Sequence, residues 1–337
     1  MSEDHLSTET SVSAEITESG VKAAAKSRTV AAVDRLVGNL AEWGNVLLEN
    51  GISRRRATIE GERKLIEAAA EYGVERMGHD DAFAKRAFES HFRRVAQEQV
   101  NKDAVVASAI EDLRQNNPTD EQAGSGPEAL SEEFMSRFES YAGGASTDEL
   151  RARWGRILAG EIRKPGIFSG KVLRATDELD TEVAMLFEGL MSSRAGNLLV
   201  KCLAPRLSVP DELKLVSAGL LAPPSSNGHY AAFNEGRDET GQAIWSAIFG
   251  TTLVGITTNF RPPPNSEILA MRHGTPAYGV YVLTDVAEAL SSILPNNEDQ
   301  VGIAYFANVA AVMPRGQVGL WTQSGPGLFS RRSTPVG

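Results

Sequence analysis

The chain has 337 residues, of which 42% are hydrophobic and 23% are charged, and its formal net charge is −10 at pH 7. This composition is typical of a globular protein long enough for two domains, and the negative charge disfavours a general binder of nucleic acid or of anionic membranes. The single cysteine, Cys202, excludes a disulfide within one chain, which fits the reducing cytoplasm.

The N-terminal third is predicted to be a tail followed by helices. Residues 1–25 are rich in Ser, Thr and Glu, so we expect a disordered acidic tail without a signal peptide. Apolar residues then recur at helical spacing in four segments, which predicts a helical bundle over 26–117. Gly, Ser and Pro are concentrated in 118–129, which is typical of a flexible linker.

The predicted bundle carries basic residues that invite a functional interpretation. Arg54, Arg55 and Arg56 stand where the second helix is expected to begin, and such a triplet can contact phosphate or nucleic acid. Glutamates one turn further along the same helix can equally pair with it, and we favour this solvated face. His79 and His91 match no familiar helical metal pair, so we predict no metal site.

Residues 130–192 are expected to form a central domain of short helices. Ser146 and Glu149 have the spacing of a capping box, which places a helix start at Ser146. Pro165 and Gly166 end that helix, because proline cannot continue it and glycine turns freely. Caps for the next two helices are predicted at Ser169 and Asp180.

Glu161 does not fit the apolar face on which its spacing places it, beside Trp154. We expect it to accept hydrogen bonds from amides near Ser169–Lys171, or to pair with a basic neighbour, and so to lock the turn. The basic candidates are Arg163, Lys171 and Arg174. An enzyme built on Glu161 is less favoured, since no second catalytic group stands at a suggestive spacing. We therefore predict no catalytic residue and no cofactor.

The same segment carries a resemblance to known proteins. The run Leu150–Leu190 resembles a bacterial family of unknown function, which is related here to the abortive-infection alpha proteins linked to bacteriophage resistance. The resemblance implies a cytoplasmic protein of bacterial or phage origin, but no chemistry, because the family has none established. The structural motif that carries it consists of Trp154, Gly160, Glu161, Pro165, Gly166 and Ser169.

Residues 193–323 are expected to form a winged-helix-like α+β domain. A helix over 208–218, a Gly-Leu-Leu exit and later strands give this pattern. The candidate recognition helix offers one basic residue, Lys214, so a protein-binding wing is favoured over a DNA reader. The uncharged run 244–260 is interpreted as buried strands rather than a membrane span, and 324–337 as a flexible tail.

These patterns predict a mainly α fold with an α+β C-terminal part, in which an elongated helical bundle is followed by a winged-helix-like module. The favoured function is a non-enzymatic protein-interaction or scaffold protein that binds another protein or itself, without a membrane, in phage defence. The alternative is a nucleic-acid-binding regulator that uses Arg54, Arg55, Arg56 or Lys214, although the acidic charge disfavours it.

Overall fold

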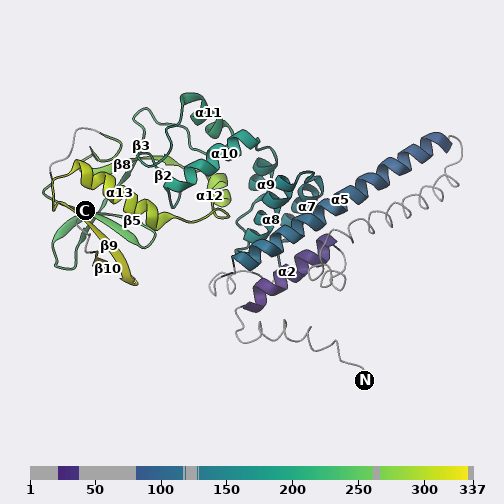
Figure 1. Cartoon of the computed structure of the whole chain (residues 1–337), viewed down its shortest axis with the longest axis horizontal. Coiled ribbons are helices and arrows are strands. Elements are labelled where there is room, and N and C mark those ends of the chain that lie inside the picture. The colour runs from purple at the N-terminus through teal and green to yellow at the C-terminus, as the bar shows by residue number, and fades with distance from the viewer. Residues whose placement is uncertain are drawn as a thin grey trace, which may run out of the picture. The chain divides into compact units, whose positions relative to one another are not determined.

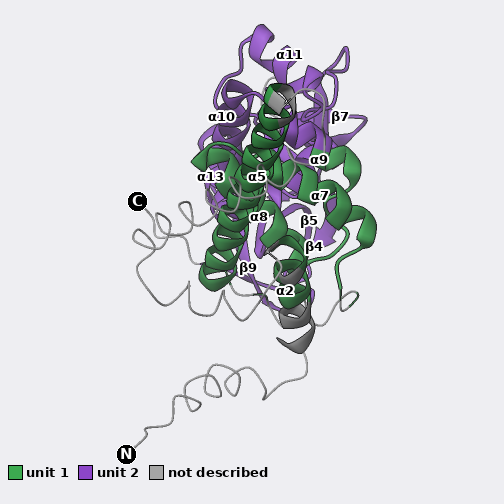
Figure 2. Ribbon diagram, turned by 90° about the vertical axis from the view of Figure 1, so that its right-hand side faces the viewer, with its two compact units in different colours: residues 1–173 green, residues 174–337 purple. Residues whose placement is uncertain are grey.

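The chain divides into two compact units, residues 1–173 and 174–337, drawn in green and purple in Figure 2. The structure is a computed structural model, and it describes residues 22–37, 81–116, 118, 127, 129–260 and 266–332 (Figure 1). Arg54, Arg55 and Arg56 and most of the predicted linker lie outside these residues. None of the described helices is long and apolar enough to cross a membrane.

Unit 1 is helical throughout its described part. Its central pair is α5 and α8, which pack along each other, and α7 and α2 pack against this pair. A further helix, α9 (Gly170–Asp177), begins in unit 1 and ends in unit 2. Among the described residues, the helices that lie wholly in unit 1 are α2 (Lys22–Val37), α5 (Asp81–Gln115), α7 (Glu132–Gly144) and α8 (Asp148–Arg163).

Trp154 of α8 is the largest side chain in the core of unit 1, and only 1% of it is exposed. Its ring stacks on Tyr141 with 5.1 Å between ring centroids, and Phe138 meets it edge-on at 5.8 Å. Both partners belong to α7. Aromatic contacts of this kind add to the stabilisation from burial itself, so Trp154 holds α7 and α8 together.

The helix starts in unit 1 follow from local capping chemistry. Thr147, not Ser146, is the N-cap of α8: its Oγ1 accepts a hydrogen bond from the amide of Leu150 at 3.2 Å. The predicted cap was therefore one residue too early. Ser131 caps α7 in the same way, and Ser169 Oγ accepts from the amide of Val172 at the start of α9. Each side chain satisfies an amide that has no partner within its own helix.

Unit 2 contains two five-stranded sheets in which every strand pairing is antiparallel. The first sheet has the order β1-β2-β8-β3, with β7 also paired to β8, and the second has the order β10-β9-β6-β5-β4. The strands of the first sheet are β1 (Arg194–Ala195), β2 (Leu198–Val200), β3 (His229–Ala232), β7 (Ala270–Arg272) and β8 (Thr275–Val282). Those of the second are β4 (Asn234–Arg237), β5 (Ala243–Phe249), β6 (Thr252–Thr257), β9 (Val318–Gly325) and β10 (Leu328–Arg331).

Among the helices of unit 2, α13 packs against β5, β6 and β9 (Figure 1). Four aromatic side chains fill the core beneath α13: Phe233, Phe249, Tyr278 and Tyr305. Burial raises the pKa of Tyr278 to about 12. The helices are α10 (Thr181–Leu190), η1 (Met191–Ser193), α11 (Val209–Ser217), α12 (Asp285–Ser291) and α13 (Glu298–Val312).

The first turn of α13 connects the two sheets. Glu298 accepts a hydrogen bond from the amide of Gly196, in the turn between β1 and β2. Asp299 accepts from the amide of Thr251 at 2.6 Å, in the turn between β5 and β6. Gly196 and Gly250 have φ values of 59° and 58°, a conformation that favours glycine. Two carboxylates at one helix start thus fix one hairpin of each sheet.

The predicted fold class is wrong. An elongated bundle followed by a winged-helix-like module is replaced by a helical unit 1 and a unit 2 built on two antiparallel sheets. The predicted recognition helix exists as α11, and Ser208 caps it, but it belongs to a unit with far more strands than a wing has. Residues 324–331, expected in a flexible tail, contain the end of β9 and all of β10.

Candidate functional site

Glu161 lies near the end of α8 with only 2% of its surface exposed. Its two carboxylate oxygens accept hydrogen bonds from the amides of Gly166 at 2.6 Å and Phe168 at 3.0 Å. Gly166 has a φ of 91°, which only glycine adopts without strain. The carboxylate therefore closes the turn that leads from α8 towards α9.

The partners of Glu161 differ from those that the sequence suggested. The donating amides belong to the turn itself, a few residues before the predicted Ser169–Lys171. Arg163 contacts a different carboxylate, since its Nη1 lies 2.5 Å from Asp112 Oδ1 and 3.2 Å from the carbonyl oxygen of Asn116. Arg163 thereby ties the end of α8 to the end of α5.

A second charge lies in the same interior. Arg28 of α2 has no exposed surface, and its Nη1 donates a hydrogen bond to the carbonyl oxygen of Pro127 at 2.9 Å. Burial lowers the pKa of Arg28, and the nearby charge of Glu161 opposes this change. A buried cation needs an opposing charge and acceptors of its hydrogen bonds. The carboxylate of Glu161 therefore closes its own turn, and its negative charge favours the charged form of Arg28.

The buried residues of α2 form one stripe along the helix. Arg28, Ala32, Val33 and Leu36 are each at most 5% exposed, whereas Val30 on another face is 41% exposed. The buried positions follow the i, i+4, i+5 and i+8 spacing of an amphipathic helix. Because α2 contacts α5 and α8, this stripe packs on the surface that the two helices form, and we call this surface the groove of unit 1.

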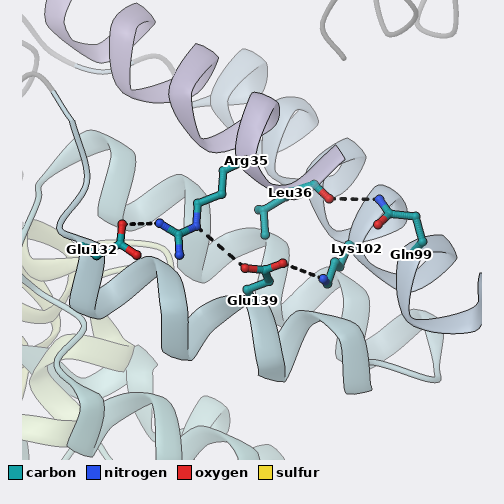
Figure 3. A network of polar contacts seen from close by, with 6 residues as sticks. All are labelled: Arg35, Leu36, Gln99, Lys102, Glu132 and Glu139. Atoms are coloured by element: carbon teal, nitrogen blue, oxygen red, sulfur yellow. Dashed lines mark hydrogen bonds and ion pairs between the residues drawn. The ribbon is translucent and has the colours of Figure 1, made fainter. Parts of the chain in front are cut away.

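Polar contacts surround this stripe at the C-terminal end of α2, and Figure 3 shows them from close by. The guanidinium of Arg35 pairs with Glu132 and lies 3.8 Å from Glu139. Glu139 also pairs with Lys102 at 2.8 Å, so this carboxylate lies between cations from α2 and α5. The network closes where Gln99 donates to the carbonyl oxygen of Leu36 at 3.0 Å.

A buried amide in α5 positions the rest of the groove. Asn101 is 3% exposed and donates to the carbonyl oxygen of Gly143 at 2.7 Å. Its Oδ1 accepts from Arg151 of α8 at 2.8 Å, and Arg151 also donates to the carbonyl oxygen of Ala145. Sequence reasoning missed Arg28, Asn101 and Arg151. Polar residues within apolar helical patterns were the signal that could have found them.

The other predicted site residues have structural partners. The carbonyl oxygen of Gly160 accepts from the amide of Lys164 at 2.9 Å, which ends α8 just before Pro165. Lys214, considered for nucleic acid, lies 2.5 Å from Glu182 on α10. In the part of the chain that the structure describes, no group of three His, Cys, Asp or Glu side chains could hold a metal ion.

Comparison with known proteins gives a family match that covers part of the region just described. Residues 85–198 match a family described as protein of unknown function (DUF2806). The matched segment contains nearly all of α5, with α7 and α8, and excludes α2. No curated protein and no solved structure matches the chain. The DUF2806 segment thus includes the surface on which α2 lies but not the helix that occupies it.

The pH dependence of stability is expected to report the burial of Glu161. Burial raises its pKa above the usual 4.5, and the amides of Gly166 and Phe168 and the charge of Arg28 offset only part of this. A raised folded-state pKa contributes stability below the unfolded-state value, and this contribution is lost as pH rises through the folded-state value. The stability of the wild type relative to Glu161→Gln should therefore fall over the pH range that begins near the usual pKa of 4.5 and extends upward.

Denaturant unfolding of both proteins across this range measures the effect. The other carboxylates cancel in the difference, because both proteins contain them. A relative stability that rises with pH would show instead that hydrogen bonds and Arg28 dominate over the burial of Glu161.

Proposed function

We propose that this chain is a non-enzymatic protein-interaction protein, and that the groove of unit 1 binds an amphipathic helix. The observation that carries the proposal is the seating of α2, which buries one arginine and a short apolar stripe against α5 and α8. Helix-in-groove recognition uses the same elements, with anchors spaced by one turn. A role in phage defence rests on the resemblance of Leu150–Leu190 to the abortive-infection alpha proteins.

The geometry of Glu161 supports binding over catalysis. A general acid or base must reach its substrate within hydrogen-bonding distance. Glu161 is 2% exposed, and both of its oxygens already accept backbone hydrogen bonds. Its carboxylate therefore acts on the chain itself, by shaping the groove and balancing the charge of Arg28.

The experiment measures binding of a labelled peptide of residues 22–37 to a chain that lacks residues 1–37, by fluorescence anisotropy. We expect saturable binding, because the truncation exposes the stripe's receiving surface. Arg28→Ala in the peptide should weaken binding by about tenfold or more, since it leaves Glu161 without its cation.

Val30→Ala in the peptide is the matched control, because Val30 is on the exposed face of α2. Circular dichroism of the truncated chain establishes that it remains helical. The proposal would be wrong if a folded truncated chain did not bind the peptide. It would also be wrong if Arg28→Ala and Val30→Ala in the peptide reduced the binding affinity equally.

A further inference from the structure

The helix that occupies the groove belongs to the same chain but not to the same family segment. The match to DUF2806 begins at residue 85, after α2 has ended at Val37. Residues 38–80 connect α2 to the start of α5 at Asp81. Residues 38–80 lie outside the described residues, and their number alone would allow a span of at most ~140 Å.

The contacts around α2 are of two kinds. Among the α2 side chains that the structure describes, the buried contacts are those of Arg28 and of the apolar residues Ala32, Val33 and Leu36. The other kind lies at the rim, where the side chain of Glu132 is 80% exposed and that of Arg35 is 31% exposed. Exposed ion pairs contribute little and are screened by salt. The seat of α2 thus depends on a few buried side chains that another helix could supply.

The buried contacts of α2 also determine which other helices could bind in its place. A helix with an apolar residue at the position of Arg28 would lose the hydrogen bond that Nη1 of the buried Arg28 donates to the carbonyl oxygen of Pro127, and also the positive charge near Glu161. A helix with a large residue at the position of Ala32 would not fit, because Ala32 is 2% exposed and closely packed. The groove therefore selects a helix that carries an arginine. Counted from this arginine, the helix has a small residue four positions later and apolar residues five and eight positions later.

We propose that α2 is an intramolecular competitor that keeps this groove closed to a partner protein carrying a helix of the same pattern. This inference rests on the proposed function, because it assumes that the groove of unit 1 binds helices. A tethered helix has a high effective concentration at its site. A partner binds only as α2 leaves, and substitutions that weaken α2 in its own chain strengthen binding of the partner.

The test uses the full chain and the labelled peptide of residues 22–37 as the probe. Arg28→Ala in the full chain is expected to increase its affinity for the wild-type peptide by about tenfold or more, since α2 then competes poorly. Leu36→Ala, on the same buried stripe, should act in the same direction. Val30→Ala should leave the affinity unchanged, and thermal melts establish that all variants are folded.

The outcomes separate the two proposals. Binding to the truncated chain, together with equal affinities of the wild-type, Arg28→Ala and Leu36→Ala full chains, overturns the competitor and leaves the helix-binding function intact. Absence of binding to the folded truncated chain removes both proposals. Light scattering adds a further outcome: a wild-type dimer that the peptide dissociates would show that α2 comes from a second copy, which overturns the intramolecular arrangement.

Discussion

Glu161→Ala is expected to lower the free energy of unfolding by about 3–5 kcal/mol, because it removes the acceptor of two backbone amides, together with a negative charge that favours the charged form of Arg28. The amides of Gly166 and Phe168 would lose partners at 2.6 and 3.0 Å. Arg28, which has no exposed surface, would keep its charge without the opposing carboxylate. Urea unfolding followed by tryptophan fluorescence measures the loss.

Glu149→Ala is the matched control for this substitution. Glu149 lies in the first turn of the same helix, and it is exposed. Its loss should cost less than about 1 kcal/mol, the usual range for a carboxylate at a helix start. The loss of unfolding free energy caused by Glu161→Gln should lie between the losses caused by Glu161→Ala and Glu149→Ala. The reason is that the single oxygen of an amide can accept only some of the hydrogen bonds that the two carboxylate oxygens accept. A similar small effect for Glu161 and Glu149 would contradict the assignment of Glu161 as the buried acceptor that closes the turn after α8.

Gly155→Ala is expected to destabilise the protein by about 2 kcal/mol, although alanine favours helices more than glycine does. A Cβ at position 155 would lie 2.5 Å from Ser108 Oγ and 3.0 Å from the backbone nitrogen of Ala109. The backbone nitrogen cannot move without shifting α5, so α5 and α8 would have to separate. Their contact supports the groove beneath α2, and thermal unfolding measures the change.

Gly189→Ala gives the opposite expectation within another helix. No atom lies within 4 Å of a Cβ built at Gly189 in α10. The substitution should therefore be neutral or stabilise by up to about 1 kcal/mol, through helix propensity alone. If both alanine substitutions stabilise the protein, then α5 and α8 do not need a glycine at position 155 in order to pack against each other.

Local chemistry explains which parts of the fold the sequence could predict. Ser169 was expected as a helix cap, and its side-chain oxygen accepts a hydrogen bond from the amide of Val172, three residues later. Asp180, which was also expected as a cap, stands at the N-cap position of α10 but makes no side-chain cap hydrogen bond. The end of α8 at Pro165 follows from the missing amide hydrogen of proline. Such signals act within one turn of chain, so the sequence contains all that they need.

The winged-helix interpretation failed because sheet pairing is not local. β8 pairs with β2 and β3, and β6 pairs with β9, across long stretches of intervening sequence. Short apolar runs indicate strands but not their partners. The sequence therefore indicated strands after residue 193 without indicating that they form two five-stranded sheets.

The same distinction between local sequence and tertiary structure applies to the candidate site. By itself the sequence determined that α8 ends at a Pro-Gly turn and that Glu161, on the apolar face of that helix, must find partners, because a carboxylate cannot be buried alone. Only the tertiary structure decided which partners these are: the amides of Gly166 and Phe168, and the charge of Arg28. Arg28 is far away in the sequence, and no local pattern links it to Glu161, since their encounter depends on how α2 packs against α8.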